Sequence, residues 1–534
     1  MNTNIYRILI SLAVLPLLIT SCYEDKGNYT YTVPDEVTIT LPERIAALTN
    51  AGYIEFTPTV VSKFDGEIKA DNPNYEFGAK INYSHKNDED QTELWLDIDE
   101  EKTMSVKYFA AVPANDYKLW YTVTNKKTGV TYSAMGTVSI GSTTYNGWMV
   151  LSNNGPQNKA RLDNIFTNAE GNPQCAYDLL GPDAPEITDA VGLHFYPSIY
   201  STNDVFGKQE SVYLLSHSGS YRLLNSTLVT RPEYSIKNLE YILNPEEMPG
   251  EPIAMANVYV YSNSASGKLL LTDAGNLYKI SSNTAGTCFE DPINTENGSI
   301  TPAYKLAPFI GVGMNRPGNS ATALLYDETN KRFLYWYVYD AATLKPCKEP
   351  DSDAKFSYSP GMDLIYMEST RFASNVVYNI MRDNAGERHI YAINMSGFGN
   401  PTQEAVYDNI TAPHFNDADK FAFHSQYPFM FYAYGDCIYC YNLTTGQVLD
   451  EISLPGEEIT RIKFNLFQNS VSSTATLRPI EDRQWELIVG SGNGQPDGGK
   501  VRFFTISEQG KASLHEEFSG FGEKVVDVLY RERP

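Results

Sequence analysis

Long apolar runs are almost absent from this 534-residue sequence. After residue 22, no segment reaches the roughly 18 consecutive apolar residues that a membrane-spanning helix needs. Positive charge is scarce as well, because 41 Lys and Arg face 65 Asp and Glu, which gives a formal net charge of -24. Such a surface repels the phosphates of nucleic acids and of anionic lipids. We therefore expect no nucleic-acid partner.

Cysteine is rare too. Apart from Cys22, the chain holds five cysteines at wide spacings, namely Cys175, Cys288, Cys347, Cys437 and Cys440. Their odd number and wide spacing indicate no disulfide framework. Cys437 and Cys440 form a CxxC, but they lie in a strand-like run, where residues three apart point to opposite faces. We interpret them as buried strand residues rather than as a metal or redox pair.

Catalytic signatures are missing as well. The sequence has no Gly-x-Ser-x-Gly elbow, and no cysteine has the flanks of a known nucleophile motif. His515-Glu-Glu-Phe518 lacks the second histidine of a zinc-protease helix. Gly490-Ser-Gly-Asn-Gly494 follows a strand-like run, but no helix pattern follows it, which favours a hairpin loop over a phosphate loop. We predict no catalytic residue, no metal ion and no cofactor.

The N-terminus carries an export signal. Arg7 supplies a positive charge, and Ile8–Leu18 is an apolar stretch too short for a confident spanning helix. The stretch ends in Leu18-Ile-Thr-Ser-Cys22, which resembles a lipobox, in which the cysteine is lipidated and the signal is cut before it. We expect residues 1–21 to be a lipoprotein signal peptide, Cys22 to be the lipid attachment site, and residues 22–36 to be a polar tether. An ordinary secretory signal with an incidental cysteine is the alternative.

The composition and the alternating runs that follow predict an all-β protein. The chain has 38 Tyr, 24 Phe, 37 Gly and 29 Pro, which is typical of strands separated by turns. Residues 37–143 contain short alternating runs at immunoglobulin-like spacing, for example Val37–Leu41, Ile54–Pro58 and Glu93–Asp97. The clearest is a hairpin, with strands at Tyr117–Asn125 and Val130–Tyr132 around a turn that contains Gly129. We predict a β-sandwich here.

An internal repeat fills residues 144–534. Its core is a strand, a glycine-bearing turn and a second strand with an aromatic residue, and the aromatic positions are Tyr221, Tyr278, Tyr335, Tyr391, Tyr439 and Phe504. They are separated by 57, 57, 56, 48 and 65 residues. One further step back reaches Asn164, where Trp148–Leu151 and Ala160–Asp163 can form the strands of a first unit. Seven such units predict a seven-bladed β-propeller, with the aromatic residues in the blade cores.

Two other folds could contain such a repeat. A pair of β-sandwiches with recurring hairpins is possible because the last two intervals drift. A parallel β-helix fits less well, since its coils repeat at a shorter period and do not need a glycine turn beside every aromatic strand.

A few polar residues remain as candidates for chemistry. His217, Asp273 and Asp383 lie at or beside the repeated turns, where residues that bond their own backbone are common. Asp97 and Asp99 alternate onto one strand face, but a calcium site there would need further oxygen ligands. Among 65 acidic residues, carboxylate pairs are expected in any fold and indicate no glycosidase. We assign no ligand-binding residue.

The layout resembles the PKD-like family of lipoproteins. The resemblance rests on the hairpin above, on Cys22-Tyr-Glu-Asp-Lys-Gly-Asn-Tyr29, and on Gly147-Trp-Met-Val-Leu151 after the sandwich. It implies an accessory surface lipoprotein of a Sus-type (SusC/SusD-like) importer, in which a TonB-dependent barrel is paired with a lipoprotein lid. It also implies an outer-membrane location that faces the cell exterior, and Glu24 and Asp25 fit this location although Tyr23 and Lys26 do not.

Three functions are left open by these observations. The first is a non-catalytic module that captures a glycan or peptide nutrient, docks on the importer, or does both. An abundance of Tyr, Trp and Asn in a chain with long loops suits such binding. The second is a propeller hydrolase or lyase that acts on polysaccharide. The third is a structural or adhesive surface protein.

Overall fold

The computed structural model describes residues 35–531 except 50–52, 83–94, 145–146, 169–170, 197–210, 226, 242–247, 260–264, 282–288, 290, 297–298, 314–321, 339–342, 397–398 and 468–478. The predictions for the signal peptide and Cys22 lie outside these residues, as does nearly all of the tether. The described residues form two compact units. Most of the residues up to Val138 belong to the first unit. The second unit contains the chain from Ser139 onward, together with short segments around residues 46–49 and 110–115.

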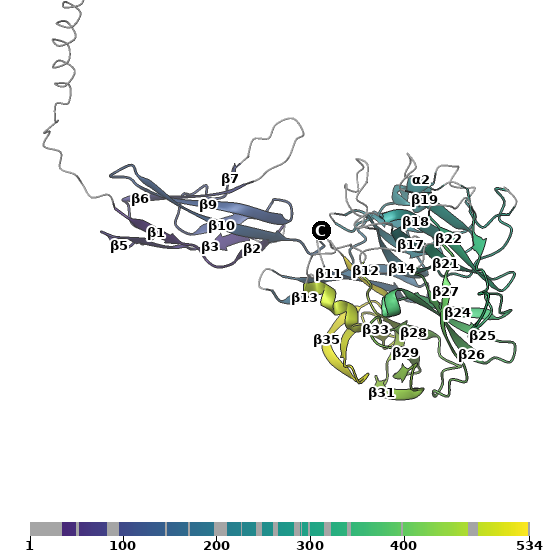
Figure 1. Cartoon of the computed structure of the whole chain (residues 1–534). Helices are drawn as coiled ribbons and strands as arrows, with labels where there is room; N and C mark the ends of the chain where they lie inside the picture. Colours follow the sequence, from purple (N-terminus) through teal and green to yellow (C-terminus); the bar gives the residue numbers. More distant parts are fainter. Residues whose placement is uncertain are drawn as a thin grey trace, which may run out of the picture. The chain divides into compact units, whose positions relative to one another are not determined.

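The N-terminal strands form the predicted β-sandwich (Figure 1). On one side β1 (Val37–Thr40), β4 (Thr59–Ser62) and β5 (Gly66–Glu67) form a sheet, and β3 (Tyr53–Phe56) pairs with β8 (Val106–Phe109). The other sheet has the order β2 (Ile45–Leu48), β10 (Thr131–Gly141), β9 (Asn115–Asn125), β6 (Tyr75–Asn82) and β7 (Trp95–Asp97). The two layers meet where the Phe56 and Tyr121 rings pack edge to face, 6.0 Å apart.

A two-residue period builds the sandwich core. Along β9, Tyr117, Leu119, Tyr121 and Val123 are buried, and the residues between them are more exposed. The predicted hairpin is confirmed, since β9 leads through a tight turn into β10. In this turn the Asn125 side chain accepts hydrogen bonds from the amides of Lys127 and Thr128, at 3.0 and 3.3 Å.

The second unit consists of seven antiparallel sheets that follow one another along the chain (Figure 1). Sheet 1 is β13 (Pro173–Ala176), β12 (Lys159–Thr167), β11 (Gly147–Asn154) and β36 (Lys524–Arg531). Sheet 2 is β14 (Ala190–Tyr196), β15 (Ser211–Ser216) and β16 (Tyr221–Leu223), and sheet 3 is β17 (Pro252–Tyr259), β18 (Ala265–Thr272) and β19 (Leu277–Ser281). Sheet 4 is β20 (Gly311–Val312), β21 (Thr322–Asp327), β22 (Arg332–Tyr337) and β23 (Lys345–Pro346).

The remaining three sheets have four strands each. Sheet 5 is β24 (Asp363–Ser369), β25 (Val376–Arg382), β26 (Arg388–Asn394) and β27 (Thr402–Tyr407). Sheet 6 is β28 (Lys420–Phe423), β29 (Phe429–Tyr434), β30 (Cys437–Asn442) and β31 (Gln447–Ser453). Sheet 7 is β32 (Glu458–Lys463), β33 (Leu487–Gly492), β34 (Gly499–Ile506) and β35 (Ala512–Phe521). The described helical segments are short: η1 (Pro232–Tyr234), α2 (Ile236–Glu240), η3 (Phe372–Ser374) and η4 (Pro479–Trp485).

Each sheet packs face to face on the next, which is the arrangement of propeller blades. Seven apolar clusters each join two neighbouring sheets. One of them joins sheet 7 to sheet 1, where Trp148 packs against Phe503 with ring centroids 4.9 Å apart. The first strands contact one another in turn, and β36 lies beside both β14 and β32. These contacts confirm the predicted seven-bladed β-propeller.

The repeat found in the sequence corresponds to one strand of each blade. Tyr221, Tyr278, Tyr335, Tyr391, Tyr439 and Phe504 lie in β16, β19, β22, β26, β30 and β34, which are the third strands counted from the inside. Asn164, one period earlier, lies in β12 at the same place in sheet 1. Five of the six aromatic residues are buried, as expected for blade cores, and Tyr221 is half-buried.

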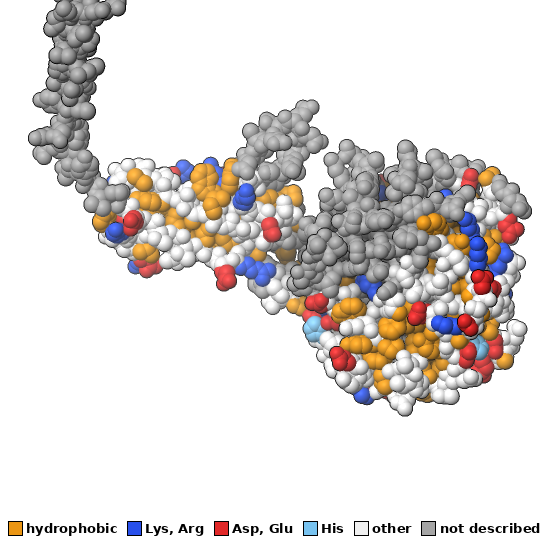
Figure 2. Space-filling view, in the orientation of Figure 1, with side chains coloured by type: hydrophobic (Ala, Val, Ile, Leu, Met, Phe, Trp, Pro, Cys, Tyr) orange, Lys and Arg blue, Asp and Glu red, His pale blue; other side chains and the backbone are white. Residues whose placement is uncertain are grey.

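The described helices give no membrane signature, and the visible face of the propeller carries charges of both signs. None of the helices in the described ranges has the length and hydropathy to span a bilayer. Figure 2 shows acidic and basic side chains of the propeller on one visible face, with hydrophobic side chains between them. A functional site must therefore be sought in the geometry of particular residues.

Candidate functional site

The inner strands of the propeller surround a cavity of about 550 Å³. Its wall takes residues from β14, β17, β24, β32 and β36, and from the chain just before β20. The lining residues are Val191, His217, Ile253, Pro308, Phe309, Tyr366, Met367, Glu368, Ser369, Arg461, Lys463, Phe464, Asn465, Leu466 and Leu529. Since five of the seven sheets and the segment that leads into a sixth contribute, the cavity forms only when the blades are assembled. We call it the axial cavity.

An ionic cluster lies at the wall of the axial cavity. Asp527 of β36 is 4% exposed, and its Oδ1 is 2.8 Å from Lys463 Nζ and 3.8 Å from Arg461 Nε. Its other oxygen accepts a hydrogen bond from the Leu193 amide at 3.0 Å. Burial by itself would raise the pKa of Asp527, but Lys463 and Arg461 hold that pKa below its usual value. Asp527 is thus a charged partner for two cations.

A second carboxyl group at the same cavity, that of Glu368, has a pKa shifted in the opposite direction. Burial raises the pKa of Glu368 to about 8, although a 2.7 Å hydrogen bond from the Phe423 amide and the charges of Arg461 and Lys463 act against this rise. Burial also raises the pKa of its neighbour Tyr366 well above the usual value. Glu368 is therefore mostly protonated at neutral pH and can donate a hydrogen bond.

Two hydrogen-bond donors at the cavity wall lack acceptors among the described residues. Arg461 Nε and Asn465 Nδ2 are both buried, and neither has a hydrogen-bond partner there. Asn465 is 1% exposed, and its Oδ1 accepts from the Tyr530 amide at 3.5 Å. Buried polar groups are nearly always paired, so a donor beside a cavity that has no partner among the described residues can bind an acceptor that enters the cavity.

The rest of the wall is apolar and aromatic. Phe309 and Tyr366 pack edge to face with centroids 5.9 Å apart, and Phe464, Ile253 and Leu529 add further apolar surface. A concave site of this size, with an apolar wall and a few convergent polar groups, has the general character of a small-molecule binding site.

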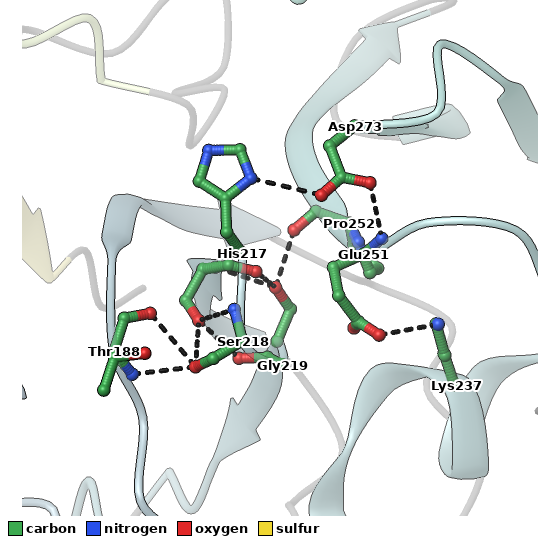
Figure 3. A network of polar contacts seen from close by, with 10 residues as sticks. Thr188, His217, Ser218, Gly219, Lys237, Glu251, Pro252 and Asp273 are labelled. Atoms are coloured by element: carbon green, nitrogen blue, oxygen red, sulfur yellow. Dashed lines mark hydrogen bonds and ion pairs between the residues drawn. The ribbon is translucent and has the colours of Figure 1, made fainter.

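Two of the three turn residues noted in the sequence join neighbouring blades at the edge of this region (Figure 3). His217 Nδ1 lies 3.1 Å from Asp273 Oδ2, and Asp273 Oδ1 accepts from the Glu251 amide at 2.9 Å. In the same network, the Ser218 hydroxyl donates to the Thr188 carbonyl at 3.0 Å. Asp273 therefore holds the turn of sheet 3 to the start of β17 and to sheet 2, rather than bonding only within its own turn.

The other candidates from the sequence are local structure. Asp383 accepts from the amides of Ala385 and Glu387 at 2.9 Å, within its own turn. The expectation that Asp97 and Asp99 share a strand face is wrong, because β7 ends at Asp97, whose carboxylate accepts from the Asp99 amide as the chain turns. The segment from Gly490 is the end of β33 and the loop to β34, and so it is a hairpin loop.

The cysteines and histidines form no metal site in the described part of the chain. No group of three or more His, Cys, Asp or Glu side chains could hold an ion there. Cys437 and Cys440 are free thiols in β30, and burial raises the pKa of Cys440 to about 12. His515 Nδ1 is paired with Glu486 at 2.6 Å. Cys288 lies outside the described residues.

The fold and the cavity define a β-propeller protein with an N-terminal β-sandwich. Residues 22–180 match the model of the PKD-like family, which confirms the resemblance noted in the sequence over that part of the chain. A comparison with curated proteins finds no match.

Several solved structures match this chain at low similarity. A quinonprotein alcohol dehydrogenase-like protein from Bacteroides thetaiotaomicron is 12% identical, with a TM-score of 0.38, over 92% of this chain and 97% of that one. A DUF4784 family protein from Bacteroides caccae is 9% identical, with a TM-score of 0.30, over 93% and 99%. The WD40 domain of SCAP from fission yeast is 9% identical, with a TM-score of 0.31, over 64% and 70%. Similarity this low carries no functional information.

Of the polar residues that line the axial cavity, sequence reasoning singled out only His217 and missed the charged cluster. A signal was present, because Asp527 interrupts the apolar run Val525-Val-Asp-Val-Leu529, and Arg461 and Lys463 alternate with apolar residues at the end of β32. Charges inside such runs are rarely buried unless they are paired or functional. The pairing itself joins positions 64 residues apart and needs the assembled ring.

Proposed function

We propose that this chain is a non-catalytic surface lipoprotein that captures a glycan or peptide nutrient in the axial cavity and docks on a Sus-type importer. The observation that carries the proposal is the cavity itself, with its apolar wall and the donors Arg461 Nε and Asn465 Nδ2, which have no partner in the described part of the chain. The lipobox-like end at Cys22 and the PKD-like match support a surface location. Lipid on Cys22 would hold the protein at the outer membrane, facing the cell exterior.

The engagement of Asp527 favours binding over catalysis. One of its oxygens is paired with Lys463, and the other accepts from the Leu193 amide. A carboxylate held in this way is a poor nucleophile or general base, because a proton or a reacting carbon must displace its partners.

A hydrolase that acts on polysaccharide is the second candidate, and one observation favours it. Glu368 and Asp527 are two carboxyl groups of one region whose pKa values are shifted in opposite directions, as in enzymes that use one as an acid and the other as a base. Incubation with candidate glycans tests this function. Turnover that is lost in both Glu368→Gln and Asp527→Asn would replace the binding proposal.

The proposed function is tested by mild detergent extraction of a tagged copy from native outer membrane. Mass spectrometry then identifies the proteins and small molecules that remain bound. We expect importer components and a glycan or peptide with the wild-type chain, and loss of membrane association in Cys22→Ala. Recovery of the wild-type chain with no importer component and no small molecule would contradict the proposal and favour a structural or adhesive protein.

A further inference from the structure

The side chains that line the axial cavity carry a net positive charge in a strongly acidic protein. Arg461 and Lys463 are balanced by only one ionised carboxylate, Asp527, which contacts both. Glu368 adds no full charge at neutral pH, because burial raises its pKa to about 8. The whole chain has a formal charge of -24. A local positive site in such a chain selects anionic ligands and concentrates them.

The wall of the axial cavity offers hydrogen-bond donors. Arg461 Nε and Asn465 Nδ2 are buried without partners among the described residues, and the ion pair of Arg461 with Asp527 is long, at 3.8 Å. The Arg461 side chain as a whole keeps 36% of its surface accessible. By contrast, Lys463 is 14% exposed and is already paired at 2.8 Å. Arg461 is thus the cation that is available to a ligand.

We propose that the axial cavity binds a ligand through a carboxylate group, with Arg461 as the anchoring cation and the Asn465 amide as a second donor. This inference rests on the proposed capture function and names the chemistry of its ligand. A guanidinium can donate two parallel hydrogen bonds to one carboxylate, and a neutral hydroxyl cannot accept in this way. One unbalanced positive charge also matches one carboxylate. The body of the ligand packs on Phe309, Tyr366 and Phe464.

Two kinds of nutrient could supply this group. An acidic sugar carries the carboxylate on its ring, and a short peptide carries it at its C-terminus. A cavity of about 550 Å³ has room for a ligand of two or three such units. The carboxylate is the common chemistry, and probes of both kinds distinguish the two sources.

Titration calorimetry on the purified full chain tests the inference with matched pairs of probes. Digalacturonic acid is compared with its methyl ester, and trialanine with trialanine amide. We expect at least one acid to bind at least about tenfold more tightly than its neutral partner, because hydrogen bonds to charged groups are the stronger ones. Arg461→Gln should abolish this preference. Arg382→Gln is the matched control, since Arg382 pairs with Asp363 away from the cavity and should keep it.

A second variant guards against misfolding of Arg461→Gln. Asn465→Asp keeps an oxygen that can accept from the Tyr530 amide and replaces the Nδ2 donor by a second oxygen, so it should stay folded while it weakens the binding of the acid. Equal binding of an acid and its neutral partner would overturn the carboxylate inference. The proposal that the cavity captures a ligand would not be affected. Failure of both acids to bind would also overturn the carboxylate inference, and the membrane extraction would then decide the capture function separately.

Discussion

Two buried charge clusters of the propeller differ in what surrounds them. Between sheets 2 and 3, Lys268 and Glu240 form an ion pair, and the Tyr213 hydroxyl bonds both, at 2.8 Å from Lys268 Nζ and 2.6 Å from Glu240 Oε1. The ammonium group of Lys268 also lies 5.0 Å from the centroid of the Tyr196 ring and 5.4 Å from that of Phe289. We call this the inter-blade cluster.

The axial cluster of Arg461, Lys463, Asp527 and Glu368 has similar charges but faces a cavity. Its cations share one carboxylate, and the buried Arg461 Nε has no hydrogen-bond partner within the described ranges. The difference teaches that buried charge alone does not indicate a binding site. The inter-blade cluster, in which Lys268 and Arg222 both lie beside Glu240, is buried and holds two blades together, whereas the axial cluster faces a cavity and offers a cation and donors to it.

The largest effect is expected at the inter-blade cluster. Lys268→Met leaves the carboxylate of Glu240, which is 4% exposed, without its closest cation. Removal of one partner of a buried pair typically costs about 3 to 5 kcal/mol of unfolding free energy. Urea denaturation measures this loss, and the double variant Lys268→Met with Glu240→Gln should recover most of it. A loss below about 1 kcal/mol would mean that the cluster is not a structural element.

A smaller loss is expected for Asp527→Asn in the axial cluster. Water in the cavity can solvate the remaining cations, and the asparagine can still accept from the Leu193 amide, so we expect about 1 to 2 kcal/mol. The folded-state pKa of Asp527 is lowered, so its contribution is present above its unfolded pKa and is lost as the pH falls through the folded value.

Thermal melts of wild type and Asp527→Asn at pH 7 and pH 3 measure this contribution. The two melting temperatures should approach each other at pH 3. The variant should also bind an acidic ligand more tightly at pH 7, because it removes the competing carboxylate. If the difference in melting temperature between wild type and Asp527→Asn grew at low pH, the lowered pKa of Asp527 would be contradicted.

The pH dependence of binding should report Glu368. With its pKa at about 8, this carboxyl is neutral at pH 7 and ionised at pH 9, where it repels an anionic ligand and no longer donates a hydrogen bond. If binding needs the neutral form, affinity should fall about tenfold between these pH values. Calorimetry at both pH values measures the change, and Glu368→Gln should remove it. Arg461, Lys463 and Tyr366 also face this group.

The folding stability should also depend on the ionisation of Glu368, and it should fall as the pH rises. The folded-state pKa of Glu368 is raised, so its contribution is fully present below its unfolded pKa and is lost as the pH rises through about 8. Relative to wild type, Glu368→Gln should therefore gain melting temperature from pH 6 to pH 9. No relative gain would mean that the carboxyl is solvated and not buried.

The smallest effect is expected at the turn network of Figure 3. His217 and Asp273 are 48% and 31% exposed, and exposed pairs contribute about 0 to 1 kcal/mol. His217→Ala should therefore change the unfolding free energy by less than about 1 kcal/mol and leave the preference for acidic ligands in place. Loss of that preference would move the binding site from Arg461 towards the turn.

The sequence predicted the fold because the fold repeats. One aromatic residue in the third strand of six sheets gave a period near 57, and a further step reached Asn164 in sheet 1. Alternation in β9 likewise predicted the hairpin of the sandwich. These signals are local, since a strand shows its buried face within a few residues.

The axial cavity could not be predicted in the same way. Asp527 meets Lys463 from 64 residues away and the Leu193 amide from 334 residues away, and no local pattern encodes either distance. Asp273 shows the same limit, because its turn gave no sign that it would bond the Glu251 amide before β17 and His217 of the neighbouring blade. Contacts between blades depend on the closed arrangement of all seven sheets, whereas the repeat depends on each blade separately.

The central claim is that the axial cavity holds the captured ligand through Arg461. Paired extraction of the tagged wild-type chain and Arg461→Gln from native outer membrane, with mass spectrometry of the small molecules that remain bound, tests it most directly. The account predicts a carboxylate-bearing molecule with the wild-type chain and its loss from the variant, while the importer components remain with both. Recovery of the same molecule in equal amount with both chains would contradict the account.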